Sequence, residues 1–311
     1  MNYLAVLSVV FALTSTGVTG VLGNPTIAQM MGFLKQYNTD WSFPRVIDIA
    51  NTVNYSALDP DVVGRVDITN TFVGAELNTE YLFGMFSSFG NDSHTSLIGV
   101  PLNQTISQLV VQGNTIFTSL IVTFNWTVEI IPVQFNVAFM FNDAGKVIEY
   151  DAVLVRSSWI LPLVLPKMVP RLAEELGLPV TTDPTFLATK RAALDICAGH
   201  EQFCTGSLTQ YNSTDACIEF IMNQVPFGDI WQAGQNTGIC RYLHAAMLSR
   251  RPAVHCPHIG PTGGDMCTEK SYFDVVLNDG FSRKFIDLPG GLTVEQALHL
   301  ADNTSCSKTG E

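Results

Sequence analysis

The feature that most constrains this chain is the placement of its cysteines. None of the seven precedes residue 197, and six of them crowd into one segment of the C-terminal half: Cys197, Cys204, Cys217, Cys240, Cys256 and Cys267. Clustering of this kind is typical of a disulfide framework formed in an oxidising compartment. The pattern therefore predicts a C-terminal half held by disulfides, with the pairing left open. Cys306 is left over, either as a free thiol or as the link of a disulfide-bonded dimer.

The first 23 residues predict secretion into such a compartment. They contain no charged residue, an apolar run from Tyr3 to Leu13, and then small residues. This layout is typical of a signal peptide, cleaved after Gly20 or Gly23. A membrane anchor is the alternative, but the apolar run is shorter than the ~20 residues that a spanning helix needs. We therefore expect a secreted, extracellular protein.

Asn-x-Ser/Thr sequons agree with that expectation, because such sites accept glycans in secreted proteins. They lie at Asn54, Asn91, Asn103, Asn125, Asn212 and Asn303. The formal net charge is −12, and an acidic surface disfavours nucleic acid and anionic membranes as partners. We expect a small-molecule ligand or substrate instead.

The N-terminal half combines helices with strands that alternate apolar and polar residues. Helical spacing predicts helices over 26–36 and 79–86, and residues 62–73 predict a strand. Further strands are predicted over 107–112, 116–128, 133–141 and 147–155, with turns at Gly113-Asn114 and at residues 142–145. Helices followed by an antiparallel sheet indicate an α+β fold.

Two runs in this half resemble the NTF2-like (SnoaL-like) superfamily. They are FVGAELNTEYLFGMF, at 72–86, and the closing hairpin FNDAGKVIEYDAVLV, at 141–155. The resemblance implies a cone-shaped domain, a curved antiparallel sheet with helices around a deep apolar pocket. That superfamily includes isomerases, cyclases and non-catalytic binding subunits, so the fold alone does not select a function.

The second half is predicted to be mainly helical. Helices are expected over 169–176, 184–197, 214–224 and 238–249. The sequence thus predicts four regions: a signal peptide (1–23), an NTF2-like domain (24–160), a proline-punctuated connector (161–180) and a cysteine- and histidine-rich domain (181–311). No family resemblance is evident for the last of these.

Histidines concentrate in the disulfide-rich segment. His244, His255 and His258 lie between Cys240 and Cys267, and His200 lies between Cys197 and Cys204. Neutral imidazole is the commonest transition-metal ligand in proteins. Three histidines would suit copper, with Met247 as an optional soft ligand, whereas zinc would use His200 as its fourth ligand. The alternative is a disulfide-linked loop whose histidines are simply hydrogen-bonded.

Two further motifs could carry chemistry. The run IGPTGGD, at 259–265, resembles a phosphate-binding loop but lacks the Gly-Lys-Ser/Thr ending, so its glycines are interpreted as turn residues. Asp151 would be a candidate proton shuttle if it faced the pocket of the cone. The favoured interpretation places both Glu149 and Asp151 on the solvent face of their strand.

Three classes of function remain. The first is a secreted, copper-dependent oxidoreductase that acts on a small organic molecule with dioxygen, its metal held by His200, His244, His255 and His258. The second is a metal-free isomerase or cyclase that uses the cone pocket. The third is a non-catalytic secreted binding protein. Convergence of at least three histidines favours the first class, and a buried acid in the cone favours the second.

Overall fold

A computed structural model describes residues 25–86, 95–278, 280, 281, 285 and 296. The predicted signal peptide, the sequons at Asn91 and Asn303, and Cys306 lie outside the described residues. The chain divides into one unit up to Gly280 and another from Phe281. This division does not test the expected boundaries at residues 160 and 180, which stay predictions.

Three helices precede the main strands. Thr26 and Gln29 form a capping box, which fixes the start of α1 (Ile27–Asp40). Helix α2 (Arg45–Thr52) follows, and α3 (Ala75–Phe83) continues into the 3₁₀ turn η1 (Gly84–Phe86). The expected helices at 26–36 and 79–86 are thus present, with bounds that differ by a few residues.

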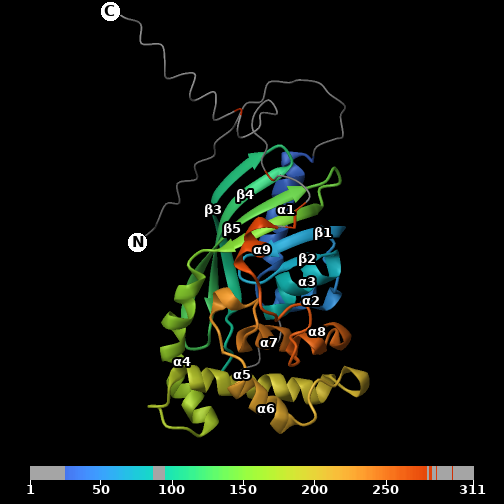
Figure 1. The fold of residues 1–311 in the computed structure, drawn as a ribbon. Helices are drawn as coiled ribbons and strands as arrows, with labels where there is room; N and C mark the ends of the chain where they lie inside the picture. Colours follow the sequence, from blue (N-terminus) through green and yellow to red (C-terminus); the bar gives the residue numbers. More distant parts are fainter. Residues whose placement is uncertain (1–24, 87–94, 279, 282–284, 286–295, 297–311) are drawn as a thin grey trace, which may run out of the picture. The chain divides into compact units, whose positions relative to one another are not determined.

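Six strands form a single curved sheet with the order β2-β1-β6-β5-β4-β3 (Figure 1). They are β1 (Leu58–Val66), β2 (Thr71–Val73), β3 (Val100–Gln112), β4 (Thr115–Asn125), β5 (Ile130–Phe141) and β6 (Val147–Leu154). Neighbouring strands are antiparallel except β1 and β6, which run parallel. The expected α+β fold, with helices packed on a curved and mainly antiparallel sheet, is confirmed.

One strand prediction needs correction. The expected single strand over 62–73 is two antiparallel strands, because the chain reverses between Val66 and Thr71. Within this turn the Thr69 amide donates to the Val66 carbonyl. Asp67 and Asn70 are residue types that favour turns, and they interrupt the alternation from which one strand was inferred.

The period-two alternation on β4 is confirmed. Leu120, Val122 and Phe124 are buried against the helices, whereas Asn125 lies on the half-buried opposite face. Aromatic side chains of α1 pack on the apolar face of the sheet. For example, the Phe33 ring contacts Phe139 edge-on at 5.1 Å between centroids. The asparagines of the other three described sequons, Asn54, Asn103 and Asn212, are exposed.

The second half is helical, as predicted. Its helices are α4 (Ile160–Leu176), α5 (Pro184–Phe203), α6 (Thr214–Asn223), α7 (Gly238–Ala245), α8 (Pro252–Ile259) and α9 (Tyr272–Leu277), and its 3₁₀ turns are η2 (Ser157–Trp159), η3 (Gly206–Leu208) and η4 (Ile230–Gln232). Figure 1 shows α5 to α8 gathered at one end of the long strands.

Helix α4 begins nine residues before the expected start at Val169 and passes through prolines. Pro162, Pro166 and Pro170 recur every fourth residue, so they share one stripe of the helix, and that stripe is exposed. The opposite stripe, which includes Val164 and Met168, is completely buried. Burial of that face offsets the backbone hydrogen bonds that the prolines remove.

The predicted disulfide framework is confirmed. Cys197 pairs with Cys217, Cys204 with Cys256, and Cys240 with Cys267. The first two bonds tie α5 to α6 and to α8, and the third ties α7 to the segment after α8. The three described helices of this half that carry histidines, α5, α7 and α8, are therefore each cross-linked to another element.

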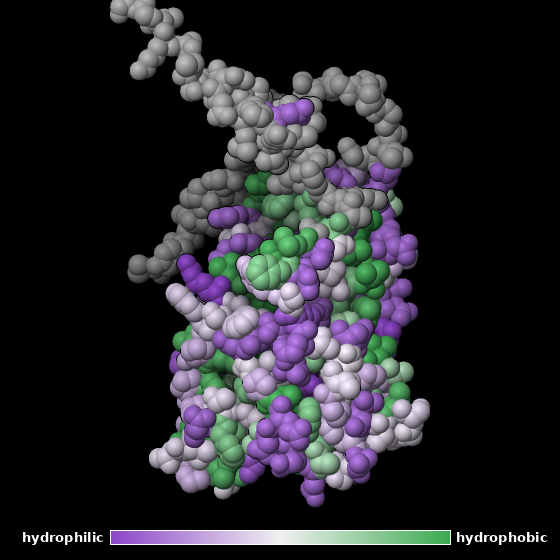
Figure 2. Space-filling model, in the orientation of Figure 1, coloured by the Kyte–Doolittle hydropathy of each residue, from purple (hydrophilic) through white to green (hydrophobic). Residues whose placement is uncertain are grey.

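The surface carries apolar side chains beside the polar ones. Figure 2 shows an apolar patch over α9, whose Tyr272, Phe273 and Leu277 are each more than two-thirds exposed. Among the described residues, no helix is long and apolar enough to cross a membrane.

The disulfide with the longest loop should contribute most to stability. Cys204 and Cys256 are 52 residues apart, and changing both to Ser should lower the free energy of unfolding by roughly 2–4 kcal/mol. Urea denaturation of the oxidised proteins measures this. The Cys197–Cys217 pair spans 20 residues, so its double Ser variant should lose less; the reverse order would contradict the loop-entropy account.

Candidate metal centre and adjoining cavity

Three of the four predicted ligands meet in the structure. His244 lies on α7, and His255 and His258 lie three residues apart on one face of α8. The Nδ1 atom of His244 lies 3.2 Å from Nδ1 of His255 and 3.0 Å from Nδ1 of His258. All three side chains are at most 4% exposed. The segment at 252–259, expected as a loop, is therefore the helix that brings two of these rings together.

The outer nitrogens of these rings face other polar side chains. Nε2 of His258 lies 2.7 Å from the Asp265 carboxylate. Nε2 of His255 lies 3.3 Å from Oε2 of Glu80, an ion-pair distance without hydrogen-bond geometry. Nε2 of His244 lies 3.2 Å from the Tyr81 hydroxyl.

These contacts determine where the ring protons are favoured. A carboxylate beside Nε2 favours the proton there and leaves Nδ1 with its lone pair. The Nδ1 lone pairs of His255 and His258 then both point toward Nδ1 of His244, which has at most one proton to share. A cation between the three nitrogens satisfies all of them.

Burial favours the neutral form of two of these imidazoles, His244 and His258. Burial, reinforced by His258 and His255, holds the pKa of His244 well below its ordinary value. Burial is also the main cause that lowers the pKa of His258, against the opposing effect of Asp265. Neutral imidazole is the form that binds a metal ion.

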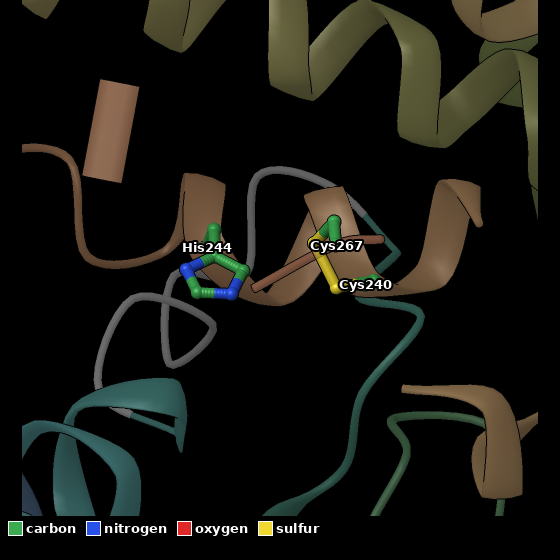
Figure 3. A group of neighbouring side chains, drawn as sticks. All are labelled: Cys240, His244 and Cys267. Carbon is green, nitrogen blue, oxygen red and sulfur yellow. A yellow bond between two sulfur atoms is a disulfide. The ribbon is translucent and has the colours of Figure 1, made fainter. Parts of the chain in front are cut away.

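The spacing fits one ion. Ligands at 2.0–2.1 Å from a tetrahedral metal lie about 3.3 Å apart, close to the separations in this cluster. The donor atoms of all three histidines fall within 4.8 Å of one another. Figure 3 shows His244 beside Cys240 and Cys267, but these two sulfurs are joined as a disulfide and are not thiolate ligands.

The structure does not place His200 in this cluster. Nε2 of His200 accepts hydrogen bonds from the backbone amides of Gln210 and Tyr211, at 2.9 and 3.3 Å. The sulfur of Met247 packs toward Gly84. Their geometry therefore supports structural roles for both.

A buried arginine holds the segment that carries Asp265. Arg241 on α7 is fully buried and donates to the carbonyls of Gly260 and Pro261, at 3.2 and 3.3 Å. Gly263 and Gly264 follow with positive φ angles of 72° and 60°, so the interpretation of these glycines as turn residues is confirmed. The Cys240–Cys267 bond closes the segment and sets Asp265 against α8.

Beside the cluster lies an apolar cavity of about 100 Å³ between the sheet and the helices. One water needs about 10–15 Å³, so the space exceeds that of a single solvent molecule. Its wall is mostly aliphatic and aromatic, including Trp41, Phe86, Phe124, Trp126, Phe135 and Phe139. No Asp, Glu, His, Lys or Arg is among the described residues that line it.

Tyr81 and α7 belong to both the cavity and the cluster. The Tyr81 ring lines the cavity, and its hydroxyl lies against His244. On α7, Ile239 and Leu243 line the cavity, whereas Cys240 and His244 lie on the stripe next to them. Tyr81 therefore lies between the apolar space and His244.

The carboxylates of β6 face away from the cavity. The expected solvent exposure is nevertheless wrong for Glu149, which is buried at 3% exposed, whereas Asp151 is half-buried. Tyr150 and Ala152 line the cavity, so Glu149 and Asp151 point away from it. Asp151 forms a bidentate ion pair with Arg65, at 2.6 and 2.9 Å. The proton shuttle considered for the cone is not provided by this residue.

Sequence reasoning missed several residues around the cluster: Glu80, Tyr81, Arg251 and Asp265. Glu80 is fully buried, and the Arg251 guanidinium donates to it at 3.0 Å. A charged residue inside the apolar run 72–86 was the available signal, because a buried carboxylate needs a partner. Asp265 was visible only as the end of a glycine-rich turn.

The comparisons with known proteins agree on the family. A model of the BfoA N-terminal domain matches residues 35–152, and one of the BfoA family C-terminal domain matches residues 156–270. Aurasperone B biosynthesis cluster protein A of Aspergillus niger is 37% identical over 271 residues, 86% of each chain. This chain belongs to the BfoA family.

A second relative, bifonsecin B biosynthesis cluster protein A of Aspergillus brasiliensis, is 37% identical over 85% of this chain and 87% of its own. Among solved structures, a steroid delta-isomerase from Pseudomonas aeruginosa covers 50% of this chain and 99% of its own, with 14% identity and a TM-score of 0.32. A protein named as a SnoaL-like polyketide cyclase from Jannaschia covers 48% and 96%, with 12% identity and a TM-score of 0.33.

Glu80 should matter for stability even without a metal. Changing Glu80→Gln removes the charge that faces Arg251 and His255, and should lower the free energy of unfolding by about 2–3 kcal/mol. Urea denaturation in the presence of a chelator measures this. Glu76→Gln is the matched control: Glu76 is 64% exposed and lies 3.4 Å from Arg251, so its loss should stay below about 1 kcal/mol. Equal losses would contradict the assignment.

Proposed function

We propose that this protein is a secreted, copper-dependent oxidoreductase that acts on an aromatic small molecule. His244, His255 and His258 would hold the ion, the cavity would hold the substrate, and dioxygen would accept the electrons. The observation that carries the proposal is the convergence of three Nδ1 atoms at 3.0–3.2 Å.

The donor set supports copper. Imidazole is a good ligand for copper, zinc, iron and nickel. Among the divalent ions of the first transition row, Cu²⁺ binds most tightly to a given nitrogen site. Three protein ligands leave a coordination position open, as catalytic metal sites require. Carboxylates that face the outer ring nitrogens, as Asp265 does, orient metal-binding histidines and increase their basicity.

The adjoining cavity supports the choice of substrate. Its aromatic wall favours a flat apolar molecule, since ring–ring contacts add to the burial of apolar area. Tyr81 would contact such a molecule on one side and His244 on the other. The relatives are named as biosynthesis cluster proteins, which agrees with an action on a small organic product.

The compartment is part of the proposal. Three disulfides support secretion, because such bonds persist in oxidising environments and are rare in the cytosol. The exposed sequon asparagines support N-glycosylation.

Metal content is the direct test. Protein from a eukaryotic host, purified without a histidine tag and loaded with copper, should retain about one copper per chain by elemental analysis. Changing His255 and His258 both to Ala should abolish retention, because two of the three ligands are lost. His200→Gln is the control and should retain the ion, since His200 lies apart from the cluster.

Two results would oppose the proposal. Absence of bound metal after copper loading would leave a binding role for the cavity alone. Retention of copper by the double variant would place the ion elsewhere on the chain.

Asp265 should tune the affinity. Asp265→Asn removes the carboxylate beside His258 and should weaken copper binding by roughly 10–100-fold, measured by competition with a chromogenic chelator. Asp274→Asn, on the exposed helix α9, is the matched control and should leave the affinity unchanged. An unchanged affinity in Asp265→Asn would contradict the orienting role.

A further inference from the structure

One polar side chain interrupts the apolar wall of the cavity. Gln104 lies on β3, is 7% exposed and lines the space. It pairs across the sheet with Val122 on β4, which pairs with Val133 on β5. All three residues line the cavity, so the amide projects from a row of valines.

Among the described residues, the amide of Gln104 has no hydrogen-bond partner. Neither Nε2 nor Oε1 makes a hydrogen bond within the part of the chain that the structure describes. Proteins pair nearly all buried polar groups, because an unpaired amide in an apolar site is unfavourable. A methionine or leucine would fill this position without that cost. Packing and hydrogen bonding within the fold therefore do not explain why this position carries an amide.

Two other unpaired atoms near the cavity have a local explanation. The Tyr150 hydroxyl and Oδ1 of Asn78 also make no hydrogen bond with any residue that the structure describes. The Tyr150 ring and Asn78 Oδ1 both lie against Gly64, which places the two groups side by side. A small rotation lets the hydroxyl donate to the amide oxygen. Gln104 has no such neighbour among its cross-strand partners.

Gln104 and Tyr81 lie near opposite edges of the sheet, so they can contact opposite ends of one bound molecule. Gln104 is on β3, one edge of the sheet. Tyr81 stacks on Phe72 of β2, the opposite edge, with 3.6 Å between ring centroids. A molecule lying across the concave face would therefore meet the amide at one end and Tyr81, beside His244, at the other.

We infer that Gln104 is the residue that orients the ligand, by pairing with a donor and an acceptor that the ligand carries side by side. A primary amide presents one N–H donor next to one carbonyl acceptor, so its complement is a carboxamide, a carboxylic acid or a hydroxy-ketone on an aromatic ring. This inference rests on the small-molecule part of the proposed function and is independent of the metal.

The test compares two isosteric probes on chelator-treated, full-length protein. Benzamide carries the donor–acceptor pair, and isopropylbenzene has a similar size and the same number of heavy atoms without it. Their dissociation constants are measured by ligand-observed NMR titration. In Gln104→Met, the preference for benzamide over isopropylbenzene should fall by about tenfold, the loss expected for one to two hydrogen bonds. The thermal midpoint should be equal to or higher than that of the natural protein, because the unpaired amide is gone.

Gln108→Met is the matched control, since Gln108 is an exposed residue of the same strand. It should leave the preference for benzamide unchanged. An unchanged preference in Gln104→Met, with both probes still binding, would overturn the role of Gln104 while leaving the cavity as a binding site. Failure of both probes to bind the natural protein would oppose the small-molecule part of the proposed function as well.

A second measurement needs no variant. The side-chain amide signal of Gln104 in the ¹⁵N-labelled natural protein should shift on addition of benzamide and should shift much less with isopropylbenzene. A signal that is insensitive to benzamide at saturation would overturn the inference even if Gln104→Met did not fold.

Discussion

The way in which α7 is fixed to its neighbours determines the geometry of both the histidine cluster and the adjoining cavity. The hydrogen bonds of the buried Arg241 guanidinium and the Cys240–Cys267 disulfide connect this helix to residues 260–267. On the neighbouring stripe, Ile239 and Leu243 line the cavity together with residues of the sheet. Because both attachments are on one short helix, His244 has little freedom to move relative to α8. The same two constraints place Asp265 against His258, so the cluster and its outer partners form together.

A single aromatic layer separates two environments of opposite character. On one side, the three imidazoles, Glu80 and Asp265 form a polar cluster, and on the other the cavity wall is mostly aliphatic and aromatic. Tyr81 belongs to both, and burial, aided by Glu80 and Asp265, holds the pKa of its hydroxyl well above the ordinary value. Tyr81 thus remains a neutral hydrogen-bonding group between a site that attracts cations and one that attracts apolar rings.

Local patterns predicted the elements well where one face of an element is buried. Alternation identified β4, β5 and β6 because the sheet has one wet face, and the fold class with its disulfide-rich half is confirmed. The helix α8 was missed because Pro257 suggested a loop, although Pro252 at its first turn and the spacing of His255 and His258 favour a helix. The meeting of α7, α8 and α3 depends on contacts distant in sequence, so the sequence could mark Glu80 as a charge in an apolar run but could not identify its partners or the contact of Asp265 with His258. Secretion, copper and oxidation stay predictions.

The depth at which the histidines are buried has a kinetic consequence. None of the three rings is more than 4% exposed, and the disulfides hold their helices in place. An ion seated there could leave only when α7 or α8 opens locally, an event with its own free energy. The rate of metal exchange would then depend on how often this region opens, whereas the equilibrium affinity would depend on the strength of the bonds between the ion and its ligands. Two variants with equal affinity could therefore differ widely in how long they keep the ion.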